Sequence, residues 1–346
     1  MKRNLAIIFF LLMSSFSSLA QVGGERIYEF LNLPSSARVT ALGGEQIATG
    51  DAEADLSFHN PSLLSADMDQ TISLNYVSYL ADINYGYASY TKHFNKWGTW
   101  SAGIHYVNYG KFVGADEYGQ ITGNFKASEY ALLISWAMQL SPKINIGASF
   151  KPIYSNLEKY NSFGLAMDFG VTYSSTDQLF KAALVAKNAG YQFIPYYGSE
   201  REPLPFEILV GMSQKLAHAP FRIAITYRHL QKFDLNYTSP LSISNRTETD
   251  QNLSDKKDSF GDKILKHMIM GLEFLPMKNV VLRTGYNFQR RQELKVDSKS
   301  STVGFSWGFG IKISQFHINY SSARYHLAGA SNHFSISTRL SDFNFK

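Results

Sequence analysis

The sequence predicts an all-β protein: a transmembrane antiparallel β-barrel of about 14 strands whose N-terminal segment folds into the lumen as a plug. Three features of the 346-residue chain lead to this prediction. They are a short leader typical of export, a long succession of segments with alternating polarity, and a regular alternation of short and long connections.

Residues 1–20 have the pattern of a cleavable signal peptide. Lys2 and Arg3 supply positive charge, and an uninterrupted apolar run follows from Leu5 to Met13. Small residues precede the expected cleavage between Ala20 and Gln21. A membrane anchor is the alternative, but a spanning helix needs about 20 apolar residues and this run is much shorter. We therefore expect an exported protein whose mature form starts at Gln21.

Composition excludes several classes of function. The chain has no cysteine, which rules out disulfides, thiolate metal sites and cysteine nucleophiles. The formal net charge of +5 is too small and too scattered for a nucleic-acid-binding protein. Aromatic residues make up 14% of the chain, which favours strands.

No motif indicates catalysis, a cofactor or a metal. The sequence lacks a G-x-S-x-G elbow and a phosphate-binding loop, and its nine histidines show no metal-ligand spacing. A hydrolase built on His105 or His317 with a serine is the weaker alternative, because such residues are more often polar groups of a lumen. We expect a protein that is not an enzyme.

Residues 21–69 differ in character from the rest of the chain. They are rich in Gly, Ala, Ser and Asp and show little alternation, with turn signals at Gly43-Gly44 and Asn60-Pro61. From Thr71 onward the alternation is regular. We therefore divide the chain into a signal peptide at 1–20, a plug at 21–69 and a barrel at 70–346.

The barrel segments place apolar residues at every second position. In 302–313 the apolar face is Val303, Phe305, Trp307, Phe309, Ile311 and Ile313, and the intervening residues are Gly, Ser and Lys. Successive side chains of a strand point to opposite faces, so this pattern separates an apolar face from a polar face. The predicted strands cover residues 71–79, 83–94, 98–110, 128–140, 143–154, 161–174, 179–187, 205–216, 220–230, 263–275, 278–290, 301–313, 315–325 and 332–341.

Connections alternate in length. Short ones occur at 95–97, 141–142, 175–178, 217–219, 276–277 and 314. Most of the intervening ones are long and polar, as at 111–127, 188–204, 231–262 and 291–300. Outer-membrane barrels have tight periplasmic turns and longer outer loops, so the pattern favours such a barrel over a soluble sandwich.

The composition of the two faces indicates which one meets lipid. The polar face carries isolated charges such as Lys151, Asp168, Arg222 and Arg283. The apolar face is almost free of charge and is capped by Trp97, Trp100, Tyr106, Trp136 and Tyr173. A soluble barrel or sandwich, the alternative, would bury the apolar face inside. We expect a multi-pass β-barrel of the outer membrane with a polar lumen.

Four stretches carry a resemblance to a known family. They are YEFLNLPSSARVTALGG at 28–44, HNPSLL at 59–64, SLNYVSYLADINYG at 73–86 and GIHYVNYGKF at 103–112. The chain resembles the PorQ-type outer-membrane barrels of the type IX secretion system and, more distantly, PorV and the FadL-like channels. Asn60, Pro61 and Ser62 resemble the Asn-Pro-Ala element of the FadL-like plug, with Ser62 in place of Ala.

This resemblance implies a role in protein secretion. It implies a lumenal hatch, 14 strands and membership of a cell-surface attachment complex, in which the barrel anchors a PorZ-like surface protein. PorU-like and PorV-like components of that complex would process cargo and attach it to lipopolysaccharide. No cofactor is implied.

Two functions from different classes follow. In the first, a surface partner docks on the outer loops, and Tyr191, Phe193, Tyr196 and Tyr197 in a Pro-containing loop are the candidate anchors. In the second, the barrel is a channel for hydrophobic small molecules. An apolar ligand needs a mostly apolar pocket, and the charged lumen-facing positions show no apolar track, so the sequence favours the anchor.

Overall fold

The computed structural model describes residues 26–49, 51, 53–233, 235, 260–294, 302–326 and 329–343. The expected cleavage between Ala20 and Gln21 lies outside these residues, as does most of the expected loop at 231–262. Within the described part of the chain, no helix combines the length and hydrophobicity of a transmembrane helix.

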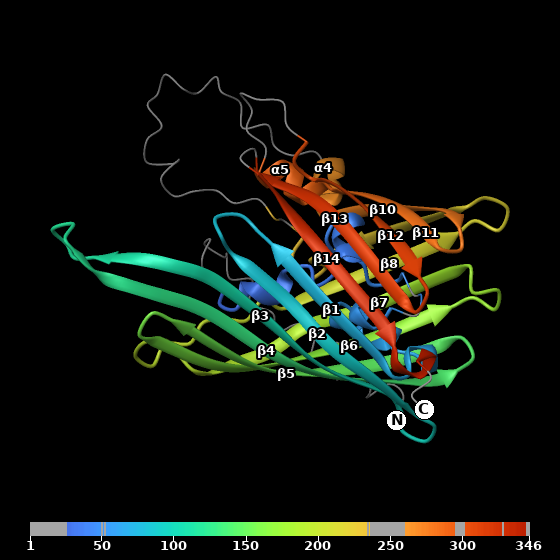
Figure 1. Cartoon of the computed structure of the whole chain (residues 1–346), viewed down its shortest axis with the longest axis horizontal. Helices are drawn as coiled ribbons and strands as arrows, with labels where there is room; N and C mark the ends of the chain where they lie inside the picture. The colour runs from blue at the N-terminus through green and yellow to red at the C-terminus, as the bar shows by residue number, and fades with distance from the viewer. Residues whose placement is uncertain are drawn as a thin grey trace, which may run out of the picture.

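Fourteen antiparallel strands form one closed barrel, in which β1 pairs with both β2 and β14 (Figure 1). Every other pairing joins neighbours in sequence. The strands are β1 (Thr71–Ser78), β2 (Asn84–Phe94), β3 (Gly98–Ala115), β4 (Ile121–Ser141), β5 (Ile144–Leu157), β6 (Tyr160–Ser174), β7 (Phe180–Ile194), β8 (Glu207–Lys215), β9 (Phe221–Tyr227), β10 (Met268–Met277), β11 (Val280–Asn287), β12 (Phe305–Ile313), β13 (Phe316–His326) and β14 (Gly329–Arg339).

The alternation in the sequence corresponds to the two faces of the wall. In β6, Met167, Phe169 and Val171 are exposed on the outside, whereas Asp168 and Thr172 are buried on the inside. The same division holds in β1, β5, β9 and β12. An apolar exterior around a polar interior is stable only when hydrocarbon surrounds the wall, and closure leaves the paired strands no open edge in lipid. The protein is therefore an outer-membrane β-barrel, as its sequence predicts.

Some strand ends differ from the prediction. The expected loop at 111–127 is mostly strand, because β3 and β4 continue as a paired ribbon that projects well beyond the barrel (Figure 1). The expected strand ends at 263–266 and 288–290 are instead helical, in α4 (Phe260–Lys266) and α5 (Phe288–Leu294), and His267 is a turn residue. The Asn287 side chain accepts a hydrogen bond from the backbone N–H of Arg290 (2.9 Å), which caps α5 and ends β11.

The N-terminal segment lies inside the barrel. It contains η1 (Glu29–Asn32), α2 (Ala37–Ala41), η2 (Ala54–Phe58), η3 (Pro61–Leu63) and η4 (Ala66–Met68). Its backbone bonds to inward-facing serines on separate parts of the wall: Ser335 of β14, Ser306 of β12 and Ser213 of β8. Since these strands surround it, the segment fills the lumen.

Candidate functional site

The Asn60-Pro61-Ser62 motif holds the plug against β5 and β6. Asn60 caps η3 by accepting from the backbone N–H of Ser62 (2.9 Å) and donates from Nδ2 to the carbonyl of Ile47 (2.7 Å). The Ser62 hydroxyl bonds to Thr172 Oγ1 (2.7 Å), and Asn145 donates to the carbonyl of Ser62 (2.7 Å). The motif thus closes its own turn and ties it to the wall.

Two glycines create the space for this motif. Gly147 and Gly170 are direct cross-strand partners on the inner face of β5 and β6. A Cβ at Gly147 would lie 2.5 Å from Pro61 C and from Ser62 N, and one at Gly170 would clash with Asn60. The close approach of the plug backbone therefore requires glycine at both positions.

An ion-pair network joins the plug to β9, β10 and β11. Glu273 lies at its centre and contacts Arg38 (Nε–Oε1 3.0 Å), Arg222 (Nη1–Oε2 2.6 Å) and Arg283 (Nε–Oε1 2.8 Å). Asp51 and Glu53 of the plug add two further carboxylates. We call these six residues the lumenal ion-pair network. Three arginines face three carboxylates, so the charges balance. Asp51 is partly exposed, whereas the other five side chains are largely buried.

A second buried group surrounds His59. Its Nδ1 lies 2.8 Å from Glu45 Oε1, its Nε2 lies 3.1 Å from Ser35 Oγ, and Glu45 also pairs with Lys187 (3.2 Å). A serine, a histidine and a carboxylate in line resemble a hydrolytic triad. All three side chains are almost fully buried inside the plug, so no substrate reaches Ser35 in this state. The group acts as an internal hydrogen-bonded support. The described residues contain no cluster of three or more His, Asp and Glu suited to a metal.

The lumen also contains an apolar region that the sequence does not reveal, contrary to the expected absence of an apolar track. Plug residues such as Phe30 and Phe58 pack against inward-facing Tyr87, Val107 and other buried wall residues. We call this group the lumenal apolar cluster. Its members are Ile27, Tyr28, Phe30, Leu31, Phe58, Val77, Tyr85, Tyr87, Val107, Ala131, Leu133, Ile153, Ala166 and Leu204. These residues are spread over the plug and several strands, so the alternation along any one strand does not reveal them.

The four candidate aromatic anchors do not share a loop, contrary to the prediction. Tyr191 and Phe193 belong to β7, which continues past the expected end at 187, and both are about half exposed. A bulge at Lys187 and Asn188 shifts the register there, so Tyr191 and Phe193 stand on the outer face. Tyr196 points inward and donates to Ser155 Oγ (2.5 Å). Only Tyr197 of the four remains a highly exposed loop residue, at 83%.

The bulge in β7 coincides with a gap in the wall. β8 begins at Glu207, which pairs with Lys187, so residues 188–194 have no β8 partner. A cavity of about 590 Å³ occupies this position and is lined by residues 188–191, 201–204 and Phe206. The segment that leads into β8 covers the gap, through bonds from Asn188 Nδ2 to the Pro205 carbonyl (3.2 Å) and from the Glu202 N–H to Gln192 Oε1 (2.9 Å).

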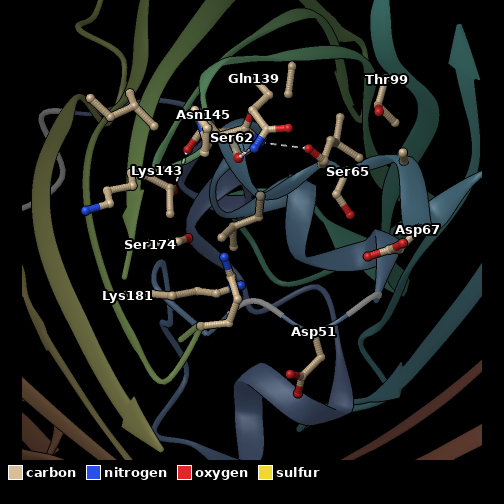
Figure 2. A pocket seen from close by; sticks show the side chains of 18 of the residues that line it. Asp51, Ser62, Ser65, Asp67, Thr99, Gln139, Lys143, Asn145, Ser174 and Lys181 are labelled. Atoms are coloured by element: carbon tan, nitrogen blue, oxygen red, sulfur yellow. Dashed lines mark hydrogen bonds between the residues drawn. The ribbon is translucent and has the colours of Figure 1, made fainter. Parts of the chain in front are cut away.

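The end of the barrel with short turns forms an open vestibule. Two cavities of about 720 and 520 Å³ lie there and share Asp51, Lys215 and Arg222. Figure 2 shows the larger one, with Asp51 and Asp67 contributed by the plug and Lys143 and Lys181 by the barrel. Short turns mark the periplasmic side of such barrels, so this vestibule faces the periplasm.

Comparison with solved structures identifies the fold. The toluene transporter TbuX of Ralstonia pickettii aligns with a TM-score of 0.54 and 13% identity, over 89% of this chain and 99% of that one. The toluene transporter TodX of Pseudomonas putida aligns with a TM-score of 0.51 and 13% identity, over 89% and 99%. In fold, the protein is a TodX-like outer-membrane barrel. No family model matches the chain, and no curated protein sequence does.

Proposed function

We propose that the protein is an outer-membrane channel for hydrophobic small molecules, the second of the two functions that the sequence suggests. The observation that carries this proposal is the position of Leu204. Leu204 lines the cavity in the β7–β8 gap and also belongs to the lumenal apolar cluster. A single side chain therefore separates an apolar space in the wall from an apolar region of the lumen.

The chemistry of this position suits an apolar ligand. Ala189, Pro203, Leu204 and Phe206 line the cavity, and the Arg201 guanidinium lies over the Tyr191 ring at its rim (5.3 Å). A mostly apolar site with a few polar groups is the usual form of a site for small hydrophobic ligands. The fold shared with two toluene transporters supports the same class of cargo.

The plug backs this cavity directly. The backbone N–H of Ile27 donates to the carbonyl of Pro203 (3.2 Å), and Ile27 is itself a member of the lumenal apolar cluster. A ligand that moves between the lumen and this cavity would separate the apolar contacts around Ile27 and Leu204. It would not pass through the lumenal ion-pair network. In this proposal the plug closes the lumen to polar solutes, while apolar solutes pass beside it.

Uptake of labelled oleate by cells that lack their own fatty-acid channel tests the proposal. We expect uptake above the empty-vector level for the natural chain and close to that level for Ala189→Phe, which fills the cavity. Ala182→Phe lies on the outer face of β7 near its periplasmic end, away from the cavity. It is the matched control and should retain uptake. Vector-level uptake by a correctly folded natural chain would contradict the proposal.

We propose as a second candidate that the protein is a PorQ-like component of the type IX secretion system that anchors a PorZ-like surface protein. This candidate rests on the sequence resemblance and on the projecting β3–β4 ribbon. The ribbon exposes Val113, Tyr118 and Ile121 and carries a stacked pair of Phe112 and Phe125 (5.1 Å). Exposed aromatic residues are enriched in protein-binding surfaces.

Replacing residues 111–126 with a tight turn tests the second candidate. If the ribbon anchors a surface protein, that protein should no longer co-purify with the barrel from outer membranes, while oleate uptake should be unchanged. Tyr197→Ala, in the connection between β7 and β8, tests the remaining anchor residue of the sequence prediction. Unchanged co-purification in both variants would remove these surfaces from the interface.

A further inference from the structure

The periplasmic vestibule carries an excess of positive charge. Its two cavities are lined by the basic residues Lys143, Lys181, Lys215, Arg222, Lys278, Arg283, Lys312 and Arg339. The acidic residues that line them are Asp51, Glu53, Asp67 and Asp177. Arg222, Arg283, Asp51 and Glu53 belong to the charge-balanced lumenal ion-pair network, so the excess comes from the other six basic residues, which face only Asp67 and Asp177. A concave surface of one predominant sign attracts a partner of the opposite sign.

Several of the acidic groups already have partners. Asp51 pairs with Arg38 and Arg222, and Glu53 pairs with Arg38 (3.1 Å) and Arg283 (3.6 Å). Asp177 accepts hydrogen bonds from Ser175 and from the Leu179 N–H within its own turn. The exposed charges that remain are mainly those of four lysines at the edge of the vestibule: Lys143, Lys215, Lys278 and Lys312.

Asp51 of the plug is held in the vestibule by two arginines. Its carboxylate accepts two hydrogen bonds from Arg222 (2.7 and 2.8 Å) and one from Arg38 (2.7 Å), which is the bidentate geometry preferred between guanidinium and carboxylate. The Asp51 side chain is 43% exposed and lies where the two cavities meet. The Arg38 side chain is almost fully buried and that of Arg222 is 10% exposed, so a carboxylate from another molecule that reaches this point meets Arg222.

The exposed lysines extend this site over a wide area. Lys215 is the last residue of β8, Lys278 lies in the turn between β10 and β11, and Lys312 lies near the end of β12. All three are exposed, and within the described part of the chain none has a carboxylate partner within 4.0 Å. Because they stand on separate strands and turns, one small anion cannot contact all of them. An extended chain with several carboxylates can.

We propose that the periplasmic vestibule is a docking site for an acidic peptide segment of a periplasmic protein. One carboxylate of the segment competes with Asp51 for Arg222, and others pair with Lys215, Lys278 and Lys312. The site lies at the opposite end of the barrel from the β3–β4 ribbon, and it does not depend on either function proposed above. Complementary charge of this kind speeds association and selects the partner more than it tightens binding.

Fluorescence anisotropy of a short labelled peptide of alternating Asp and Ser tests this proposal. The natural barrel is reconstituted in nanodiscs of zwitterionic phosphatidylcholine, so that both ends are accessible and no lipid competes as an anion. We expect saturable binding that weakens as salt rises, and no binding of the matching Lys–Ser peptide. The triple variant Lys215→Gln, Lys278→Gln, Lys312→Gln should bind about tenfold more weakly, since each exposed pair contributes modestly.

Two further variants make the test specific. Lys111→Gln, Lys126→Gln, Lys159→Gln removes the same charge from exposed lysines at the opposite end and should bind as the natural chain does. Asp51→Asn removes the competing internal carboxylate and should bind more tightly. Equal weakening in the two triple variants, absence of binding to the natural chain, or weaker binding by Asp51→Asn would each overturn the proposal.

Discussion

Arg38 in the plug and Glu273 on β10 form an ion pair inside the barrel (Nε–Oε1 3.0 Å), although 235 residues separate them in the chain. Both side chains are about 1% exposed. The pair fixes α2 of the plug to the wall at a level where neither charge is solvated. The plug is therefore held by specific, charge-balanced contacts as well as by packing.

Glu273→Gln should destabilise the barrel strongly. The substitution leaves Arg38, Arg222 and Arg283 with one buried carboxylate fewer, and breaking a buried pair costs about 3–5 kcal/mol because an uncompensated charge remains. Unfolding in detergent, followed by heat-modifiable gel mobility, measures the loss. Glu117→Gln, at the exposed tip of the β3–β4 ribbon, makes the same chemical change and should have little effect. Equal stability of the two variants would contradict the role assigned to the network.

Gly147→Ala should displace the plug from β5 and β6. The added Cβ would lie 2.5 Å from the backbone of Pro61 and Ser62, so the Asn60-Pro61-Ser62 turn must move. Because the chain has no cysteine, a single Ala54→Cys reports on the buried plug, and a polar maleimide should label it faster in the Gly147→Ala background. Gly261→Ala is the control, since nothing lies within 4 Å of its Cβ position. Unchanged labelling would show that the wall absorbs the methyl group.

Asp55 should make the stability of the plug depend on pH. Burial, together with the charge of Glu53, raises the pKa of Asp55 to about 7, above the value of about 3.9 for an exposed carboxyl. The folded chain therefore retains a proton that the unfolded chain releases. This contribution to stability is complete below about pH 4 and is lost as the pH rises toward 7.

The melting temperature of Asp55→Asn, compared with that of the natural chain from about pH 5 to about pH 8, checks this expectation. The natural chain should lose stability relative to the variant over this interval. A difference between the two proteins that stays constant with pH would show that Asp55 remains ionised in the folded state.

The tryptophans should report contact with lipid. All four lie on the outer surface of the barrel or its turns, and Trp97, Trp100 and Trp136 form a group at the periplasmic end, where the indole N–H groups of Trp100 and Trp136 donate to the carbonyl of Trp97. Reconstitution in lipids with brominated acyl chains should quench the intrinsic fluorescence strongly. Emission equal to that in unbrominated lipid would contradict the assignment of the apolar face to hydrocarbon.

The sequence predicts the strands best where they cross hydrocarbon. Met167, Phe169 and Val171 alternate with Asp168 and Thr172 because one face meets lipid and the other meets the lumen. Outside the hydrocarbon region the two faces of a strand no longer differ in polarity, and there the predicted strand ends are wrong. The β3–β4 ribbon from Lys111 onward has water on both faces, so no alternation marks it as strand. The bulge at Asn188 similarly hides the continuation of β7.

The sequence by itself determined that the chain is a barrel of fourteen strands with its apolar face outward, because that choice depends on the local alternation of side chains. Through a family resemblance, the sequence also indicated Asn60, Pro61 and Ser62 as a motif of the plug. Only the tertiary structure decided which groups meet inside the lumen. Insertion of the plug into the closed barrel places Arg38 beside Glu273 and brings Ile27 and Leu204 into one apolar cluster, and contacts between such distant residues leave no periodic signal in the chain.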